Sequence, residues 1–167
     1  MDLLNTTSET ECTTLLSQCC ASHRWVAAML AMRPYHSPAS VLDAAEDCWH
    51  KLEETDWLEA FDAHPKIGDP DSLKQKYRDT HSMAKGEQSG VDAASESVIE
   101  ALADANQQYE GRFGFIFIVC ATGKSAAEML HLLNQRLNNA RDQELQIAAA
   151  EQLKITLIRL EKLTNPS

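Results

Sequence analysis

FGFIFIVCATG, residues 113–123, is a continuous aromatic and β-branched run, and this composition is typical of a buried β-strand. The sequence on both sides of it has helical periodicity and offers no partner strand. A lone strand in a core would leave its backbone N–H and C=O groups unpaired, which costs free energy. We therefore predict an all-α fold with one buried extended segment at about residues 113–121. The backbone N–H groups of this segment are candidates for ligand binding.

Three helical patterns surround this segment in the sequence. The pattern before it is expected to end at Gly111. Its apolar stripe consists of Val91, Ala94, Val98, Leu102, Ala105 and Tyr109. The pattern after it begins with Ser125 as a candidate N-cap and carries Met129, Leu130, Leu133 and Leu137. The last pattern lies near the C-terminus and carries Leu145, Ala149, Leu153, Leu157 and Leu160. Such stripes predict amphipathic helices whose apolar faces enclose the extended segment.

Two further helices are predicted in the first half of the chain. Ser37 and Pro38 have the residue types of an N-cap and a first helical position, and the pattern behind them runs to about residue 52. The next helix has Thr55 or Asp56 as its expected cap. It is expected to end near His64, because a residue that precedes proline disfavours the α-helical region.

Length, composition and charge restrict the class of protein. The chain has 167 residues, of which 44% are hydrophobic, and this is enough for one domain with a sizeable core. We predict a single compact multi-helix domain over residues 1–167, in which residues 1–35 are only weakly determined by the sequence. The net charge of −10 predicts no nucleic-acid partner and no anionic membrane surface, because the mean field repels phosphate. No run approaches the roughly 20 apolar residues that a membrane span needs.

The cysteines point to a reducing compartment. Their number is odd and no C-x-x-C pair exists, which argues against a disulfide framework and a structural zinc site; they are Cys12, Cys19, Cys20, Cys48 and Cys120. The N-terminal residues are acidic and lack the basic region and apolar run of a signal peptide. Reduced thiols and a cytoplasmic location are therefore expected.

Three possible functional features, a phosphate-binding loop, a helical metal site and a cysteine nucleophile, are each disfavoured by the surrounding sequence. TGKS at residues 122–125 matches the end of a phosphate-binding loop, but Ile118 occupies the position where that motif needs glycine, so Ser125 is better explained as a helix cap. No two histidines lie three or four residues apart on one predicted helix, so we expect no helical metal site; ligands from separate segments remain an alternative. Cys120 is a possible nucleophile, but its apolar surroundings disfavour the thiolate.

His64 has a more distinctive setting, in the stretch AFDAHPKIGD at residues 60–69. A helix end followed by Pro65 fixes the backbone and directs the imidazole away from the helix body. About twenty residues later come Glu87 and Gln88, whose adjacent acceptors and donors match the edge of a ureido or imide group. Taken singly, a histidine is more often a surface or satisfied core residue than a catalyst, and a Glu–Gln pair is more often a solvated loop or a first helical turn.

Four stretches together resemble one enzyme family. TDWLEAFDAHPKIGD, GEQS, FGFIFIVCATGKSAAEML and AAAEQLKITLIRLEKL are similar to the 2-oxo-4-hydroxy-4-carboxy-5-ureidoimidazoline (OHCU) decarboxylases, in the order that the family has them. The resemblance covers roughly residue 40 to the end. It implies an all-α fold, a carboxy-lyase activity in purine and uric acid degradation that yields (S)-allantoin, and no metal or organic cofactor. It also implies a homodimer and functional coupling to the preceding 5-hydroxyisourate hydrolase.

The resemblance also implies the site residues. The catalytic positions fall on His64 and Glu87. The substrate-binding positions fall on Pro65, Ala84, Lys85, Gly86, Glu87, Gln88, Ile116, Phe117, Ile118, Val119, Cys120 and Arg159. The family often has serine where this chain has Ala84, so one side-chain hydrogen bond to the substrate is expected to be absent. The site is expected to contain no metal.

Histidine is suited to acid–base work at neutral pH, because its ordinary pKa is about 6.5. The resemblance therefore predicts that His64 acts on the substrate hydroxyl while Glu87 and Gln88 orient the ureido group. Two other classes of function remain alternatives at this point. One is a hydrolase or isomerase of another cyclic ureide that uses the same residues. The other is a helical interaction module without catalysis, which would tolerate loss of His64.

Overall fold

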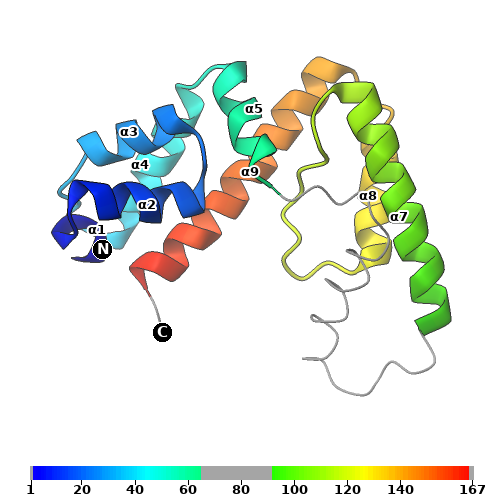
Figure 1. The fold of residues 1–167 in the computed structure, drawn as a ribbon, viewed down its shortest axis with the longest axis horizontal. Helices are drawn as coiled ribbons and strands as arrows, with labels where there is room; N and C mark the ends of the chain where they lie inside the picture. The colour runs from blue at the N-terminus through cyan, green and yellow to red at the C-terminus, as the bar shows by residue number, and fades with distance from the viewer. Residues whose placement is uncertain (1, 65–91, 166–167) are drawn as a thin grey trace. The chain divides into compact units, whose positions relative to one another are not determined.

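The structure is a computed structural model that describes residues 2–64 and 92–165. Over these residues the chain forms helices joined by turns and irregular segments, and none of them lies in a β-strand (Figure 1). The all-α prediction is therefore confirmed. The residues group into two compact units, one made of Met1–His64 with Ala149–Ser167 and the other of Pro65–Ala148. The single domain over residues 1–167 remains a prediction.

The first unit begins with three helices that the sequence pattern did not resolve. They are α1 (Asp2–Thr6), α2 (Glu9–Cys19) and α3 (His23–Ala31). Ser8 and Ser22 cap the second and third of these helices through their side-chain oxygens. Leu16 and Trp25 are completely buried, so the N-terminal residues supply part of this unit's core rather than only a cover for it.

Two helices of this unit begin at capping boxes. The first, α4 (Pro38–His50), begins as predicted, with Ser37 as its N-cap and proline at the first position. The second, α5 (Glu54–Asp62), begins one turn earlier than expected, because its N-cap is Glu53. The expected cap, Asp56, instead accepts a hydrogen bond of 3.2 Å from the Glu53 backbone N–H. Its carboxylate thus serves the third position of a capping box.

The C-terminal part of α9 (Arg141–Thr164) completes the first unit. Its predicted apolar stripe is buried at Ala149, Leu153 and Leu160. The Trp49 indole N–H donates to the Ala149 carbonyl at 3.0 Å, which joins α4 to α9. A buried indole combines a large apolar area with one polar group that must find a partner, so this bond fixes the two helices at a defined place along each other.

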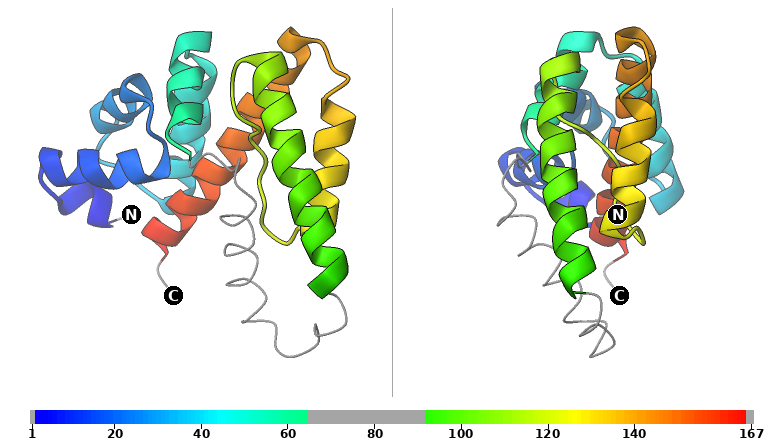
Figure 2. Two further views of the ribbon diagram at one scale, coloured as in Figure 1. Left: turned by 45° about the vertical axis from the view of Figure 1, so that its right-hand side comes forward. Right: turned by 90° about the vertical axis from the view of Figure 1, so that its right-hand side faces the viewer.

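The second unit contains α7 (Asp92–Phe113), α8 (Ala126–Arg136) and the beginning of α9. The helices α7 and α8 pack against each other, and the connection between them runs alongside (Figure 2). Ser125 caps α8, as predicted. The predicted end of α7 at Gly111 was wrong, because the helix continues to Phe113 and ends at Gly114. Gly114 has φ +82°, a left-handed conformation that glycine adopts readily at a helix C-terminus.

The connection after Gly114 is the predicted extended segment, and it is neither helix nor strand. Phe115, Ile118 and Cys120 are buried, while the residues between them are partly exposed. The Arg136 guanidinium donates to the Ile118 carbonyl at 2.8 Å. A side chain therefore supplies a partner that a neighbouring strand would provide in a sheet, and this explains how a strand-like sequence is accommodated among helices.

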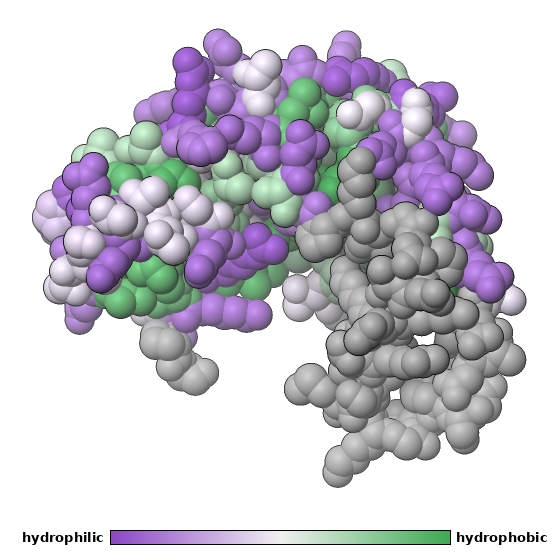
Figure 3. All heavy atoms as spheres, viewed as in Figure 1, coloured by the Kyte–Doolittle hydropathy of each residue, from purple (hydrophilic) through white to green (hydrophobic). Residues whose placement is uncertain are grey.

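Polar and charged residues cover much of each unit on the face shown in Figure 3, as expected for a chain with a net charge of −10. Among the described residues, Leu3 and Met32 are the large hydrophobic side chains that stay exposed. No described helix combines the length and hydropathy needed to cross a membrane.

Candidate active site

His64 lies just beyond the C-terminus of α5, as the sequence predicted. Its backbone N–H donates to the Phe61 carbonyl at 3.1 Å, which continues the helical turn by one residue. The side chain is half-buried, and its Nε2 atom lies 2.6 Å from Oε1 of Gln152 in α9. The imidazole is therefore held against a neighbouring helix and is partly accessible, which suits a group that must reach a substrate.

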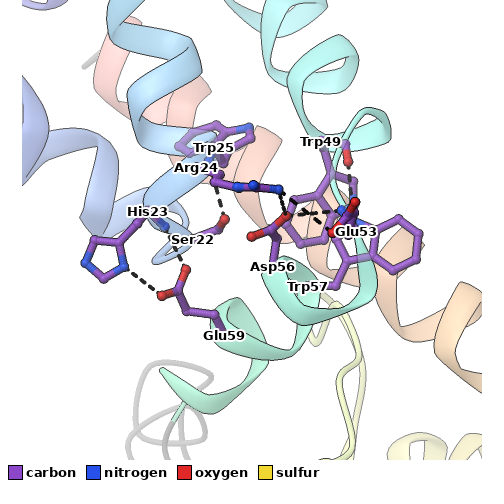
Figure 4. A network of polar contacts seen from close by, with 9 residues as sticks. All are labelled: Ser22, His23, Arg24, Trp25, Trp49, Glu53, Asp56, Trp57 and Glu59. Atoms are coloured by element: carbon purple, nitrogen blue, oxygen red, sulfur yellow. Dashed lines mark hydrogen bonds and ion pairs between the residues drawn. The ribbon is translucent and has the colours of Figure 1, made fainter.

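Helix α5 is itself fixed to α3 by a polar network (Figure 4). The Glu59 carboxylate accepts hydrogen bonds from the His23 backbone N–H at 2.8 Å and meets the His23 Nδ1 atom at 2.7 Å. Arg24 lies 3.4 Å from Asp56 one turn earlier. The hydrogen bonds from His23 lower the pKa of Glu59, so this carboxylate stays ionised at neutral pH. The network orients the helix that carries His64 at its end.

Gln152 and Thr156 lie one turn apart on α9, and both are buried. The Gln152 side-chain Nε2 donates to Thr156 Oγ1 at 3.2 Å. The Thr156 hydroxyl donates to the Gln152 backbone carbonyl at 3.0 Å. Neither residue was predicted from the sequence to belong to the site. The signal was available as two polar residues spaced by four beside the apolar stripe of the last helix.

Arg159 continues the same face of α9, three residues beyond Thr156. Its guanidinium donates to the backbone carbonyls of Gln18 and Cys19, at 3.3 and 3.4 Å. These carbonyls belong to the last turn of α2, where a cation is favoured by the helix dipole. The structure thus places Arg159 in the same unit as His64, on the helix that contacts the imidazole.

Two buried thiols lie near this face of α9. Burial raises the pKa of Cys19 to about 11, and the Arg159 charge acts in the opposite direction. Burial likewise raises the pKa of Cys20 to about 11, while hydrogen bonds from Ser22 and Thr156 oppose the shift. Both groups are therefore neutral thiols at physiological pH, and they are poor candidates for nucleophiles.

The predicted binding segment Ile116–Cys120 lies in the second unit, on a buried ionic network. Arg136 Nε and Tyr109 Oη each lie 2.5 Å from Oε1 of Glu144. The Arg136 guanidinium also lies over the Phe117 ring at 4.6 Å. Burial and the hydrogen bond to Glu144 raise the pKa of Tyr109 above its usual range. This network holds the segment's backbone at Ile118.

The remaining predicted site residues fall outside the described part of the chain; they are Pro65, Ala84, Lys85, Gly86, Glu87 and Gln88. The expectation that His64 and the Glu87–Gln88 pair contact the same ligand therefore remains a prediction. Within residues 2–64 and 92–165, no three side chains of histidine, cysteine, aspartate or glutamate come together as a metal site.

The sequence of this chain matches one known protein family. The family model for OHCU decarboxylase matches residues 5–161. The chain therefore belongs to the OHCU decarboxylase family. The match includes the N-terminal helices, which the sequence resemblance did not reach.

Several individual proteins are similar to this chain. The uric acid degradation bifunctional protein TTL of Arabidopsis thaliana is 39% identical over 145 residues, which are 87% of this chain and 45% of that protein. The OHCU decarboxylase of Halalkalicoccus jeotgali is 26% identical over 143 residues, which are 85% of this chain and 78% of that protein. This chain thus spans less than half the length of the Arabidopsis relative.

Solved structures show the same fold. A crystal structure of OHCU decarboxylase in the presence of (S)-allantoin superimposes with a TM-score of 0.72 and 35% identity, and the match covers 95% of this chain and 99% of that one. A crystal structure of (S)-allantoin synthase superimposes with a TM-score of 0.67 over 95% of this chain and 52% of that one. Its identity of 19% supports the fold alone.

Proposed function

We propose that this chain catalyses the cofactor-independent decarboxylation of OHCU to (S)-allantoin, as a carboxy-lyase of uric acid degradation. The observation that carries the proposal is His64, which a helix end and a buried glutamine hold in one orientation, 2.6 Å from the amide oxygen. Membership of the OHCU decarboxylase family and the likeness to a decarboxylase structure with (S)-allantoin present support the choice of substrate.

The substrate supplies its own electron sink. One ring carbon carries a carboxylate and a hydroxyl, and it lies beside a C=N group. When the bond to the carboxylate breaks, its electron pair forms a carbon–carbon double bond and the imine nitrogen takes up a proton. The hydroxyl then becomes a carbonyl as it loses its proton, and the neighbouring carbon gains a proton on one face. No pyridoxal or thiamine group is required for this sequence.

His64 is assigned to the hydroxyl beside the departing carboxylate, where it accepts or shares the proton. Glu87 and Gln88 orient the ureido group and so select the face that is protonated, and Pro65, Ala84, Lys85 and Gly86 complete the proposed binding loop. Backbone N–H groups of Ile116–Cys120 bind negative charge that develops on a ring oxygen.

Arg159 is assigned to attract the anionic substrate rather than to clamp its carboxylate. A tight clamp would stabilise the ground state and slow the loss of CO₂. The guanidinium already donates to the Gln18 and Cys19 carbonyls, which supports a steering role.

The proposal includes a cellular setting. A cytoplasmic location is supported by the five cysteines, none of which forms a disulfide in the structure. Functional coupling to a preceding hydrolase is supported by relatives that are named as bifunctional proteins of uric acid degradation, from Arabidopsis thaliana and from Bacillus sp. strain TB-90. The homodimer rests on the family resemblance.

Circular dichroism of freshly made OHCU tests the activity, because only the enzymatic route gives one enantiomer of allantoin. His64→Ala is expected to lower kcat by about 10²–10⁴-fold, since a positioned acid–base group typically contributes that much. His131→Ala is the matched control, because His131 is exposed on α8 and is expected to leave turnover unchanged. Activity is also expected to survive exhaustive chelation.

Near-normal turnover by His64→Ala would remove the catalytic assignment. Turnover of a different cyclic ureide by the wild-type protein would instead favour the hydrolase or isomerase alternative. No turnover of any ureide would favour the helical interaction module.

A further inference from the structure

The strongest unassigned feature is the buried amide of Gln152, which is 1% exposed. Both ends of the amide have a side-chain partner, since Oε1 lies 2.6 Å from His64 Nε2 and Nε2 lies 3.2 Å from Thr156 Oγ1. A buried amide needs hydrogen-bond partners, and here one of those partners is the proposed catalytic ring. We infer that Gln152 is a positioning residue that holds the His64 ring and fixes its neutral form as the Nε2–H tautomer.

The orientation of the amide follows from Thr156. The Thr156 hydroxyl has one proton, and its acceptors are the Gln152 backbone carbonyl at 3.0 Å, one helical turn earlier, and the Cys20 sulfur. The hydroxyl oxygen can then only accept from the Gln152 side chain, so the NH₂ group faces Thr156. The carbonyl oxygen of the amide consequently faces His64. Thr156 thus sets which end of Gln152 the imidazole meets.

The tautomer follows from the amide. An amide oxygen is an acceptor only, so the His64 Nε2 atom must carry a hydrogen. A neutral imidazole has one N–H group, and Nδ1 is therefore the nitrogen that takes up a proton when His64 acts as a base. This assigns the base to one atom and gives the ring a fixed orientation toward the substrate hydroxyl. The catalytic part of the inference rests on the proposed function of His64.

A glutamine holds the ring differently from the carboxylate that orients histidine in many hydrolases. The neutral amide keeps its hydrogen bond whether the ring is neutral or protonated, and it adds no full negative charge beside it. Gln152 therefore orients the ring without forming an ion pair with the imidazolium.

The first test needs no substrate. Long-range ¹H–¹⁵N spectra of protein labelled at histidine report which ring nitrogen carries the hydrogen, and His64→Ala identifies the signal. We expect a pyrrole-type shift for Nε2 and a pyridine-type shift for Nδ1 in the neutral wild-type protein. A neutral ring with its hydrogen on Nδ1 would overturn the inference.

The second test separates positioning from binding by kinetics. Gln152→Met keeps the length of the side chain and removes both polar ends, and we expect kcat to fall by about 10–100-fold, the range found for residues that orient metal-ligating histidines. KM should change by less than about twofold, since the residue does not touch the substrate. Gln146→Met is the matched control, because Gln146 is exposed on the same helix.

Two substitutions of Thr156 test the same hydrogen-bond chain from Thr156 through Gln152 to His64 and leave the amide in place. Thr156→Val removes the hydroxyl at nearly constant volume and should lower kcat and change the His64 spectrum, whereas Thr156→Ser should restore both. This pair also decides the question if Gln152→Met fails to fold. Equal kcat values and equal spectra for the Val and Ser variants would overturn the inference.

The outcomes distinguish the inference from the proposed function. Absence of OHCU turnover in the wild-type protein would remove the function, and the spectra would still decide the tautomer. Normal turnover with an unchanged kcat in Gln152→Met would remove the inference and leave the function in place.

Discussion

The two units each bury a polar network, and the networks differ in charge. In the first unit, the neutral side chains of Gln152 and Thr156 hold His64. In the second unit, an ion pair between Arg136 and Glu144 holds the extended segment. The side chains of this pair are only 10% and 0% exposed.

The difference follows from what each network has to hold. The extended segment needs a permanent partner for the Ile118 carbonyl, and a guanidinium that is always charged gives a strong, fixed hydrogen bond. The imidazole of His64 must change its charge during the proposed reaction, and a neutral amide accommodates both states. Charge is thus buried where the backbone must stay still, and a neutral amide holds the ring on which a proton is proposed to move.

The largest expected effect comes from breaking the ionic network. Glu144→Leu leaves Arg136 buried without its carboxylate and should lower the free energy of unfolding by about 3–5 kcal/mol. Urea denaturation measures the change. The double variant Glu144→Leu with Arg136→Met removes both charges and should recover part of the loss. A single variant that loses less than about 1 kcal/mol would show that this pair does not hold the second unit together.

An intermediate effect is expected at high pH in the first unit. The folded state raises the pKa of Cys20 from 9.0 to about 11, so folding favours the neutral thiol. The resulting stability is present below pH 9 and is lost as the pH rises toward about 11; a shift of this size corresponds to at most about 2–3 kcal/mol. The measurement is the unfolding free energy at several pH values in wild type and Cys20→Ala. The variant should show the shallower decline, and parallel declines would contradict the prediction.

The smallest effects are expected at two glycines near the start of the extended segment. Gly114→Ala should destabilise by about 1 kcal/mol, because φ is +82° and an L residue is strained there. Gly111→Ala should stabilise by about 0.5–1 kcal/mol, because this position is helical. A β-carbon would meet nothing within 4 Å at either position, so the two substitutions differ only in backbone conformation. Thermal unfolding of both variants should therefore show shifts of opposite sign.

Local patterns in the sequence predicted much of the fold. The caps at Ser37 and Ser125 are short-range hydrogen bonds between neighbouring residues, and both are present in the structure. The prediction of a buried, unpaired segment was confirmed after Gly114, where residues 116–121 are neither helix nor strand, but Phe113 belongs to α7. The cap of α5 was predicted at Thr55 or Asp56 but is Glu53; aspartate fits both the first and the third position of a capping box, and Asp56 occupies the third.

Long-range contacts were not predictable in this way. The placement of His64 at a helix end follows from the proline after it, but its partner Gln152 is 88 residues away along the chain. The helices α1 to α3 within residues 1–35 were also not identified from the sequence, although they bury Leu16 and Trp25. The roles of Glu87 and Arg159 came from the family resemblance, and they remain predictions.

All three tryptophans, Trp25, Trp49 and Trp57, belong to the first unit, and the second unit has tyrosine and phenylalanine as its aromatic residues. Intrinsic indole fluorescence is therefore a reporter of one unit alone, while far-UV ellipticity records the helices of both. Melting curves from the two signals will coincide if the chain unfolds in one cooperative step and will separate if the units unfold independently. The native chromophores thus provide a readout of cooperativity without any added label.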